Sequence, residues 1–534
     1  MRLASSSPRQ SFAISLGLII AAGVFSTSCG SSGSMSGASA PKFSGNTPVT
    51  VILTSTANDQ LAEFDLGFQS VTLTSQSGKT VTLLSPGSGP GAEFVHLNGT
   101  AEPLVTTSVP QDVYTAATVT LSGAQFVCIE LGPENGQQVL DTSTYNYLGL
   151  PASDVSVTLP SPITVTGTNM GLSLDLLVAE SATYSACFTP GGVSSFSITP
   201  TFNLSPATLS SSPTNAADGR VTGLDGQVTA IGASGSSLTL SLPDDEGTRP
   251  VSVSSDTNTA YQGISDFPAL TVGTFVDMDG AIQSDGSVLA TRISVEDTSA
   301  VDVFRGPLME VTPSVSAFLM LPRLEQGSDF MNKVVLGSDS FRFSDAAFKI
   351  SGQFANLGSL PFVPTFSASN MVPGQEVYVS TESAIPVDGT FPTAATITLM
   401  PQTINGTVAR SSTSGDFTDY TVSLAPYDLF PMLAVQPGET TVENNPSQVE
   451  VYVDSNTQLL NTQPLATGGT LRFYGLVFND NGTLRMDCAQ VNDGVPFSPP
   501  SNTNALREVG QAQTTRRAGP GGTQQIISVV THSR

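Results

Sequence analysis

The sequence is short of the side chains on which most enzyme active sites depend. Its 534 residues include two histidines, four cysteines and no tryptophan. Imidazole and thiolate are the usual bases and nucleophiles near neutral pH, so their scarcity argues against an enzyme that uses them. We expect His96 to be packed in a strand, and His532 lies close to the C-terminus. The sequence therefore indicates no catalytic residues.

Several motifs that carry chemistry are also absent. The chain has no HExxH, no GxSxG and no CxxC pattern. These absences argue against a zincin, a hydrolase with a nucleophile elbow and the common structural zinc sites. The acidic run Asp277-Met278-Asp279-Gly280 lacks the spacing of an EF-hand calcium loop. We expect it to be an exposed strand edge, and we expect no metal and no cofactor.

Positive charge is scarce as well. The chain has 19 lysines and arginines against 44 aspartates and glutamates, which gives a net charge of −25. Nucleic acid binding needs basic side chains at the phosphates, so nucleic acid is not an expected partner. Simple attraction to an anionic lipid surface is disfavoured for the same reason. Neutral glycans, cations and other proteins stay open as partners, and the negative charge also keeps an exported protein soluble.

What the chain has in quantity is typical of short strands and tight turns. Charged residues make up only 12% of the sequence, whereas it contains 49 glycines and 36 prolines. Threonine, valine, serine and glycine recur throughout, as in all-β proteins. After the N-terminal segment no apolar run approaches 18 residues, so no transmembrane helix is expected.

The N-terminus resembles a bacterial lipoprotein signal. Arg2 and Arg9 precede an apolar stretch, Phe12 to Phe25, that is short for a membrane span. The small residues before Cys29 resemble a lipobox, although Ser26 stands where leucine is usual. This resemblance implies a signal peptide over residues 1–29, lipid on Cys29, and a protein exported to the outer membrane or cell surface. The alternative is an ordinary signal peptide with Cys29 incidental.

Residues 30–47 are rich in serine and glycine and predict a flexible linker behind the lipidated cysteine. Three cysteines remain after it. Cys128 and Cys187 lie in apolar, strand-like contexts and form a candidate disulfide, since an exported protein can keep one. The alternative is two buried thiols, and Cys488 is left over in either case.

Residues 48–212 predict a β-sandwich domain, with short strands separated by turn signals. The runs Val71 to Thr74 and Val81 to Leu83 flank Ser75-Gln76-Ser77-Gly78, which predicts a hairpin. Three further motifs in this domain are Phe94 to Gly99, Val109 to Tyr114 and Leu172 to Leu177. On these motifs the region resembles the N-terminal domain of bacterial lipoproteins catalogued as family four-three-eight-two, with Gln111-Asp112 where that family usually has Ala-Gly.

Beyond residue 213 the chain repeats itself three times. Each copy contains two motifs in the same order. The first is Gly-x-apolar, and the second is a turn with the pattern apolar-x-x-Gly-x-x-apolar. The turn glycines are Gly273, Gly374 and Gly468. A glycine before a strand takes positive φ without steric cost. We therefore predict three small β-barrel modules at residues 221–298, 303–400 and 404–493, for which an OB-like topology is one option. The second diverges and carries an insertion, Asp345 to Phe366.

The first copy resembles the bacterial family of unknown function catalogued as five-six-six-six. The resemblance is carried by Gly226 to Ile231, Leu270 to Gly280 and Asp285 to Ile293. The two family resemblances imply an architecture and bring no activity with them. Residues 500–534 are predicted to be a disordered tail. The alternative there is that Ile526 to Val530 adds a strand to a neighbour.

Three functions are compatible with this sequence. The first is a non-catalytic envelope lipoprotein whose β modules bind or scaffold a protein or neutral glycan. The second is a structural subunit of a surface assembly, and the third is a hydrolase that uses carboxylates. Tyrosine suits a wet binding surface because its hydroxyl stays hydrated. The candidate contacts are Tyr261, Tyr378, Tyr452 and Tyr474, and the alternative for each is packing on a barrel.

Overall fold

The structure is a computed structural model that describes residues 43–534 apart from short gaps. The gaps are residues 57–58, 87–89, 135–136, 149–153, 184–196, 245–246, 328–338, 355–356, 384–390, 426–427, 435–446, 461–464, 496–512, 519–523 and 532–534. The predicted signal peptide, Cys29 and most of the linker lie outside the described residues. The described chain consists mainly of strands, with two short α-helices, α1 (Val178–Ser181) and α2 (Leu429–Ala434). The all-β fold class is confirmed.

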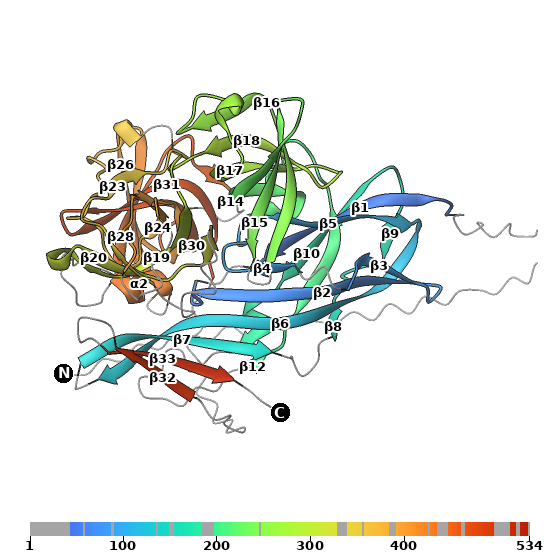
Figure 1. Ribbon diagram of the computed structural model, residues 1–534, viewed down its shortest axis with the longest axis horizontal. Helices are drawn as coiled ribbons and strands as arrows, with labels where there is room; N and C mark the ends of the chain where they lie inside the picture. The colour runs from blue at the N-terminus through green and yellow to red at the C-terminus, as the bar shows by residue number, and fades with distance from the viewer. Residues whose placement is uncertain are drawn as a thin grey trace, which may run out of the picture. The chain divides into compact units, whose positions relative to one another are not determined.

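Two sheets form the N-terminal sandwich (Figure 1). The first has the order β13-β10-β1-β5: β13 is Phe202–Ala207, β10 Met170–Leu176, β1 Asn46–Ser55 and β5 Glu102–Pro110. The second has the order β3-β2-β6-β7: β3 is Thr80–Leu84, β2 Glu63–Ser75, β6 Asp112–Glu134 and β7 Gln137–Leu148. Shorter strands extend the second sheet, namely β4 (Gly91–Glu93), β8 (Asp154–Val157) and β9 (Ile163–Val165). The sequence-predicted hairpin is β2-β3.

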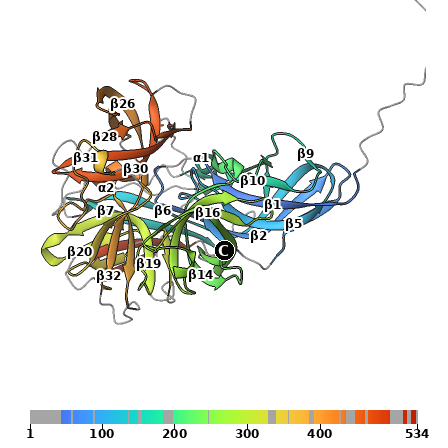
Figure 2. The same ribbon diagram turned by 90° about the horizontal axis from the view of Figure 1, so that it is seen from above.

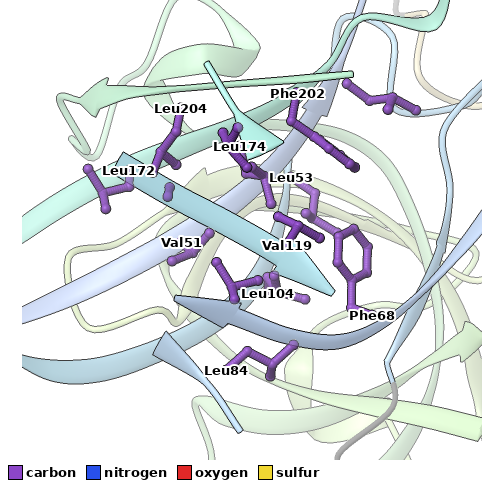
Figure 3. Close-up of a cluster of buried hydrophobic side chains, with 14 of the residues drawn as sticks. Val51, Leu53, Phe68, Leu84, Leu104, Val119, Leu172, Leu174, Phe202 and Leu204 are labelled. Carbon is purple, nitrogen blue, oxygen red and sulfur yellow. The ribbon is translucent and has the colours of Figure 1, made fainter. Parts of the chain in front are cut away.

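The sandwich core lies between these sheets. Figure 3 shows leucines and valines of both sheets around Phe68 and Phe202, whose ring centroids are 6.1 Å apart. Side chains of a strand alternate between its two faces. In β1, Val51 and Leu53 accordingly belong to the sandwich core, whereas Ile52 between them belongs to the core of the following barrel. This strand of the first sheet is therefore buried on both faces.

Three barrels follow with one shared strand order. Barrel 1 is closed and comprises β14 (Arg220–Ile231), β15 (Ser237–Asp244), β16 (Gly247–Gln262), β17 (Phe275–Ile282) and β18 (Val288–Ser294). Barrel 3 comprises β26 (Gln402–Ser414), β27 (Phe417–Leu424), β28 (Gln448–Val453), β29 (Gln458–Leu459), β30 (Thr470–Asp480) and β31 (Thr483–Asp493). Figure 2 shows β26, β28, β30 and β31 grouped in orange and red.

Barrel 2 has the same order with a divided third strand. It comprises β19 (Asp302–Thr312), β20 (Ala317–Met320), β21 (Leu324–Gln326), β22 (Asp339–Arg342), β23 (Ala347–Ile350), β24 (Glu376–Thr381) and β25 (Thr396–Leu399). The strands β22 and β23 lie at the two ends of this sheet, which is open, whereas barrel 1 is closed. In all three barrels the first strand pairs with the second and the fourth, and the third runs parallel to the fifth. A five-stranded Greek-key barrel of this kind is OB-like.

The repeated glycines build the same turn three times. Each has a positive φ, of 95° in Gly273, 92° in Gly374 and 87° in Gly468. Each donates its backbone N–H to a carbonyl of the first strand of its barrel, in Val228, Leu308 and Val408 respectively. Left-handed backbone is strained for any residue with a Cβ. The turn that introduces the fourth strand therefore depends on glycine in each copy.

The structure differs from the sequence prediction in the insertion and in the tail. Ala347–Ile350, inside the predicted insertion, is the barrel strand β23, which pairs with β25. Two stretches of the predicted disordered tail are strands, β32 (Gln513–Ala518) and β33 (Gln524–Thr531), and β33 pairs with β7 (Figure 1). The strand-addition alternative describes this pairing, because a β-branched run meets the open edge of a sheet.

Candidate functional site

A cavity of about 160 Å³, the central cavity, is lined by residues of the sandwich and of all three barrels. Its charged and phenolic lining residues are Asp59, His96, Arg220, Arg305, Arg323, Glu376, Asp428, Arg472 and Tyr474. Four of the chain's 19 basic residues thus meet at one place in a strongly acidic protein. Convergent polar groups in a concave site mark a candidate binding site.

The three barrels carry polar residues at equivalent positions of their first and fourth strands. The residue before each first-strand glycine is polar, and it lies opposite a residue of the fourth strand. The three pairs are Asp225 with Asp277, Arg305 with Tyr378, and Asn405 with Arg472. Of these six residues, Arg305, Asn405 and Arg472 line the central cavity.

Barrels 1 and 2 are joined by buried ion pairs. Arg305 Nη1 lies 2.8 Å from Asp225 Oδ2 and 3.3 Å from Asp277 Oδ2. Arg292 pairs with Asp277 as well, and its Nε lies 2.7 Å from Asp279 Oδ2. Burial alone lowers the pKa of Arg305, but the surrounding carboxylates outweigh it and the pKa is raised. Burial raises the pKa of Asp225 to about 6 in spite of Arg305.

These contacts correct the expectation for the acidic run. Asp277 is 2% exposed and bridges two arginines, so it is not part of an exposed edge. A buried carboxylate needs such partners because an unpaired charge is costly in a low-dielectric interior.

Barrel 3 is joined to the sandwich by a second ion pair. Arg472 donates from Nε and Nη2 to Asp59, at 2.8 and 2.6 Å. Beside them Asp428 is buried and accepts a hydrogen bond of 3.3 Å from Asn405 Nδ2. Burial, with the nearby charge of Asp59, raises the pKa of Asp428 to about 8. At neutral pH this carboxyl group therefore keeps its proton and can donate a hydrogen bond.

The third joint, between the sandwich and barrel 1, is made by Glu102, which also binds His96. The Nδ1 of His96 lies 3.1 Å from Glu93 Oε2, and its Nε2 lies 2.8 Å from Glu102 Oε1. Glu102 also pairs with Arg249 of barrel 1. Burial lowers the pKa of His96, but the two glutamates outweigh it and raise the pKa to about 9. His96 is therefore a cation with both ring nitrogens engaged, which does not suit a general base.

The structure places His96 in a turn after β4, and not in a strand as predicted. Glu93 fixes that turn by accepting the backbone N–H groups of Phe64, Val95 and His96, at 2.9, 2.7 and 2.7 Å. An acid that holds consecutive backbone donors and the imidazole ends the strand at this point.

The lining of the central cavity includes two buried donors that the described residues leave without a hydrogen-bond partner. They are Arg220 Nη1 and Asn98 Nδ2. Arg220 Nη2 donates to Thr222 Oγ1 at 3.2 Å, and burial lowers the pKa of Arg220. The wall is fixed by backbone contacts, since Ala101 N donates to Arg220 O at 2.9 Å.

The tyrosines predicted as ligand contacts lie in different environments. Tyr378 and Tyr452 are buried, with 3% and 4% of their surface exposed. Tyr261 is partly buried and packs against the core of barrel 1. Tyr474 lines the central cavity and donates a hydrogen bond of 3.4 Å to Gln353 Oε1.

Other parts of the chain cover outer surfaces of the barrels. Phe362 of barrel 2 packs on Tyr452 of barrel 3, with ring centroids 5.4 Å apart, and Arg485 lies over the Phe362 ring. A further cluster contains Leu429 and Met432 of α2, Met309 and Leu321 of barrel 2, and Ala62 and Val127 of the sandwich. In an OB-fold the second and third strands bind ligands. The second strand of barrel 2, β20, adds Leu319 to this cluster.

Sequence reasoning missed most of the cavity. Of its charged and phenolic residues only Tyr474 was a predicted contact. A signal was present, because the repeat glycine is preceded by Asp225, Arg305 and Asn405, which are polar residues in otherwise apolar strand openings.

The remaining predicted sites can be located only in part. Cys29 and Cys187, and the side chain of Cys128, lie outside the described residues, whereas Cys488 is a buried free thiol. The residues that the structure describes contain no cluster of three or more histidine, cysteine or acidic side chains arranged to hold a metal ion.

Comparison with known proteins gives one family. A model described as "Domain of unknown function (DUF5666)" matches residues 225–294, which span the strands of barrel 1 from within β14 to the end of β18. No curated protein matches the chain.

Proposed function

We propose that this chain is a non-catalytic, exported envelope protein whose β units form one scaffold that binds a partner outside the cytoplasm. The observation that carries the proposal is a set of buried ion pairs that join the sandwich and the three barrels, two of which involve residues that line the central cavity. Arg249 pairs with Glu102, Arg305 with Asp225, and Arg472 with Asp59. Each pair links two different units.

Such pairs favour a scaffold over a string of independent modules. Removing one partner of a buried ion pair costs about 3–5 kcal/mol, because it leaves the other charge uncompensated. Arg323 adds a link by donating from Nε to the Ala62 carbonyl at 2.7 Å. Independent modules on flexible linkers have no need of buried charge complementarity between them.

The anchor belongs to the same proposal. Lipid on Cys29, followed by the linker at residues 30–47, holds the folded body away from a membrane. We further propose that the sandwich belongs to the family catalogued as four-three-eight-two, on the motifs Phe94 to Gly99 and Leu172 to Leu177. Incorporation of labelled fatty acid into the wild type, and its loss in Cys29→Ala, supports the anchor. Absence of the label from the wild type contradicts it.

Capture of partners tests the binding function. Tagged wild-type protein is crosslinked in intact envelopes and, in parallel, purified protein is applied to an array of neutral glycans. We expect one reproducible protein or glycan partner. If only copies of the chain itself or of one lattice-forming protein are recovered, the protein is a structural subunit of a surface assembly.

One observation favours carboxylate catalysis as a second candidate function. Asp428 is a protonated acid at neutral pH and lies near Asp59 in the central cavity. In hydrolases that use two carboxyl groups, the group with the raised pKa acts as the acid and the ionised group acts as the base or nucleophile. A screen of glycosidase, esterase and protease substrates decides between the two functions. Turnover that Asp428→Asn abolishes would establish the enzyme.

A further inference from the structure

We infer that the central cavity binds a small organic anion through the donors of Arg220 and Asn98. The ligand class is a carboxylate or a phosphate group on a compact molecule. This inference rests on the proposed binding function and names what the cavity of the scaffold holds. It concerns residues that sequence reasoning did not select.

The two orphaned donors carry the argument. Buried polar side-chain atoms are nearly always hydrogen-bonded, so each exception needs an explanation. Among the described residues that line the central cavity, the buried side-chain nitrogens and oxygens without a partner are Arg220 Nη1 and Asn98 Nδ2. Both are donors and neither is an acceptor. A group with several acceptor oxygens would satisfy both.

The charge balance singles out Arg220 among the cationic groups of the cavity. Arg472 is paired with Asp59, Arg305 with Asp225 and Asp277, and Arg323 with Glu376 at 3.2 Å. His96 is paired with Glu93 and Glu102. Within the described residues Arg220 makes no ion pair, and its side chain bonds only Thr222.

The nearest acid does not supply the missing partner. Asp279 is the carboxylate whose charge acts on Arg220. Its Oδ2 accepts from Arg292, and its Oδ1 accepts from Gly223 N at 2.9 Å and from Gln353 Nε2 at 3.3 Å. Both oxygens of Asp279 are therefore engaged elsewhere, and Arg220 Nη1 keeps its N–H groups for an oxygen of a carboxylate or a phosphate.

Other lining groups favour an anion as well. The proton kept by Asp428 at neutral pH removes one negative charge from the lining. The backbone on both sides of Arg220 is fixed, since Thr222 N donates to Thr100 Oγ1 at 2.7 Å, so the donors are held in place before binding. A volume of about 160 Å³ holds roughly ten water-sized groups, which limits the ligand to a small molecule.

The test measures anion binding by the full-length protein in detergent. Inorganic phosphate and succinate are titrated by calorimetry against sodium chloride at equal ionic strength. Loss of a charge-assisted hydrogen bond weakens binding by about ten- to a hundredfold, so Arg220→Gln is expected to lower the affinity by that factor. Asn98→Ala is expected to lower it less. Arg410→Gln, at an exposed arginine of β26, is the matched control and leaves the affinity unchanged.

Saturable binding of either anion that Arg220→Gln weakens supports the inference, and the preferred anion separates a phosphate ligand from a carboxylate ligand. Circular dichroism in the absence of anion establishes that Arg220→Gln is folded. Binding of neither anion by the wild type, or equal binding by Arg220→Gln, contradicts the inference. A protein that captures an envelope partner but binds no anion contradicts this inference alone. A protein that binds an anion but captures no partner contradicts the proposed function alone.

Discussion

In barrel 1 the position before the first-strand glycine is Asp225, and its cross-strand neighbour is Asp277; in barrel 3 the same two positions hold Asn405 and Arg472. The backbone around them is equivalent, down to a register irregularity two residues after the glycine in both barrels. The two barrels therefore differ in charge where they agree in geometry. The first-strand glycine is the same in both barrels, whereas the polar side chains beside it differ and form ion pairs with different neighbouring units.

The largest effect is expected from removing the cation that joins barrel 1 to barrel 2. Arg305→Met leaves Asp225, Asp277 and Glu376 buried without their shared partner. We expect a loss of about 3–5 kcal/mol in the free energy of unfolding, measured by urea denaturation. The control is Arg410→Met at an exposed position, with an expected change within about 0.5 kcal/mol. If the two variants lowered the free energy of unfolding equally, the ion pairs of Arg305 would not be what joins barrel 1 to barrel 2.

A smaller effect is expected from a Cβ at the repeat glycine. In Gly406→Ala the new Cβ would lie 2.4 Å from the Ser423 carbonyl oxygen, whereas at Gly226 the nearest atom is 3.2 Å away. Overpacking of this kind costs about 1–3 kcal/mol. We expect Gly406→Ala to lower the thermal midpoint more than Gly226→Ala does. Gly358→Ala, which meets nothing within 4 Å, is the control.

The pH dependence of stability tests the junction of barrel 3, because Asp428, which binds Asn405 there, has a folded-state pKa of about 8. An aspartate in the unfolded chain titrates near 3.9, so between about pH 4 and 8 the native state binds more protons than the unfolded state. Stability from this group is complete below about pH 4 and is lost as the pH rises through 8. The slope amounts to at most about 1.4 kcal/mol per pH unit.

Asp428→Asn removes this slope because the amide has no proton to lose. We expect the variant to match the wild type near pH 4 and to be the more stable protein near pH 8, in urea denaturation at both values. Asp285→Asn is the control, at a largely exposed turn position where hydrogen bonds from Ser287 lower the pKa. An Asp428→Asn variant that is no more stable than the wild type at pH 8 argues against a protonated Asp428.

Local signals in the sequence predicted the barrels better than the cavity. Positive φ at Gly273 and Gly468, and the Asn481-Gly482 turn with φ of 51° and 87°, follow from residue type alone. The pairing of Arg472 with Asp59 spans 413 positions. No local pattern specifies such a pair, because it depends on how complete units pack. The turn at His96 was missed although it is local, since Glu93 lies three residues before His96 and accepts its backbone N–H.

Burial also separates the tyrosines that were predicted as ligand contacts. Tyr378 and Tyr474 lie in equivalent strands, yet the first is buried against Phe275 and Met400 whereas the second lines the central cavity. Strand alternation gives the face of the barrel on which a side chain lies, but not whether another unit covers that face. The distinction becomes visible only when the units are placed together.

A double-mutant cycle between barrels 1 and 2 tests the scaffold most directly. The free energy of unfolding is measured for the wild type, Asp225→Asn, Arg305→Met and the double variant. Residues that interact directly show coupling of about 0.5–3 kcal/mol, whereas independent sites are additive within about 0.3–0.5 kcal/mol. A buried pair that joins the barrels predicts a coupling above about 1 kcal/mol. Additive effects would contradict the scaffold, because they would mean that the Asp225–Arg305 pair does not couple the stabilities of the two barrels.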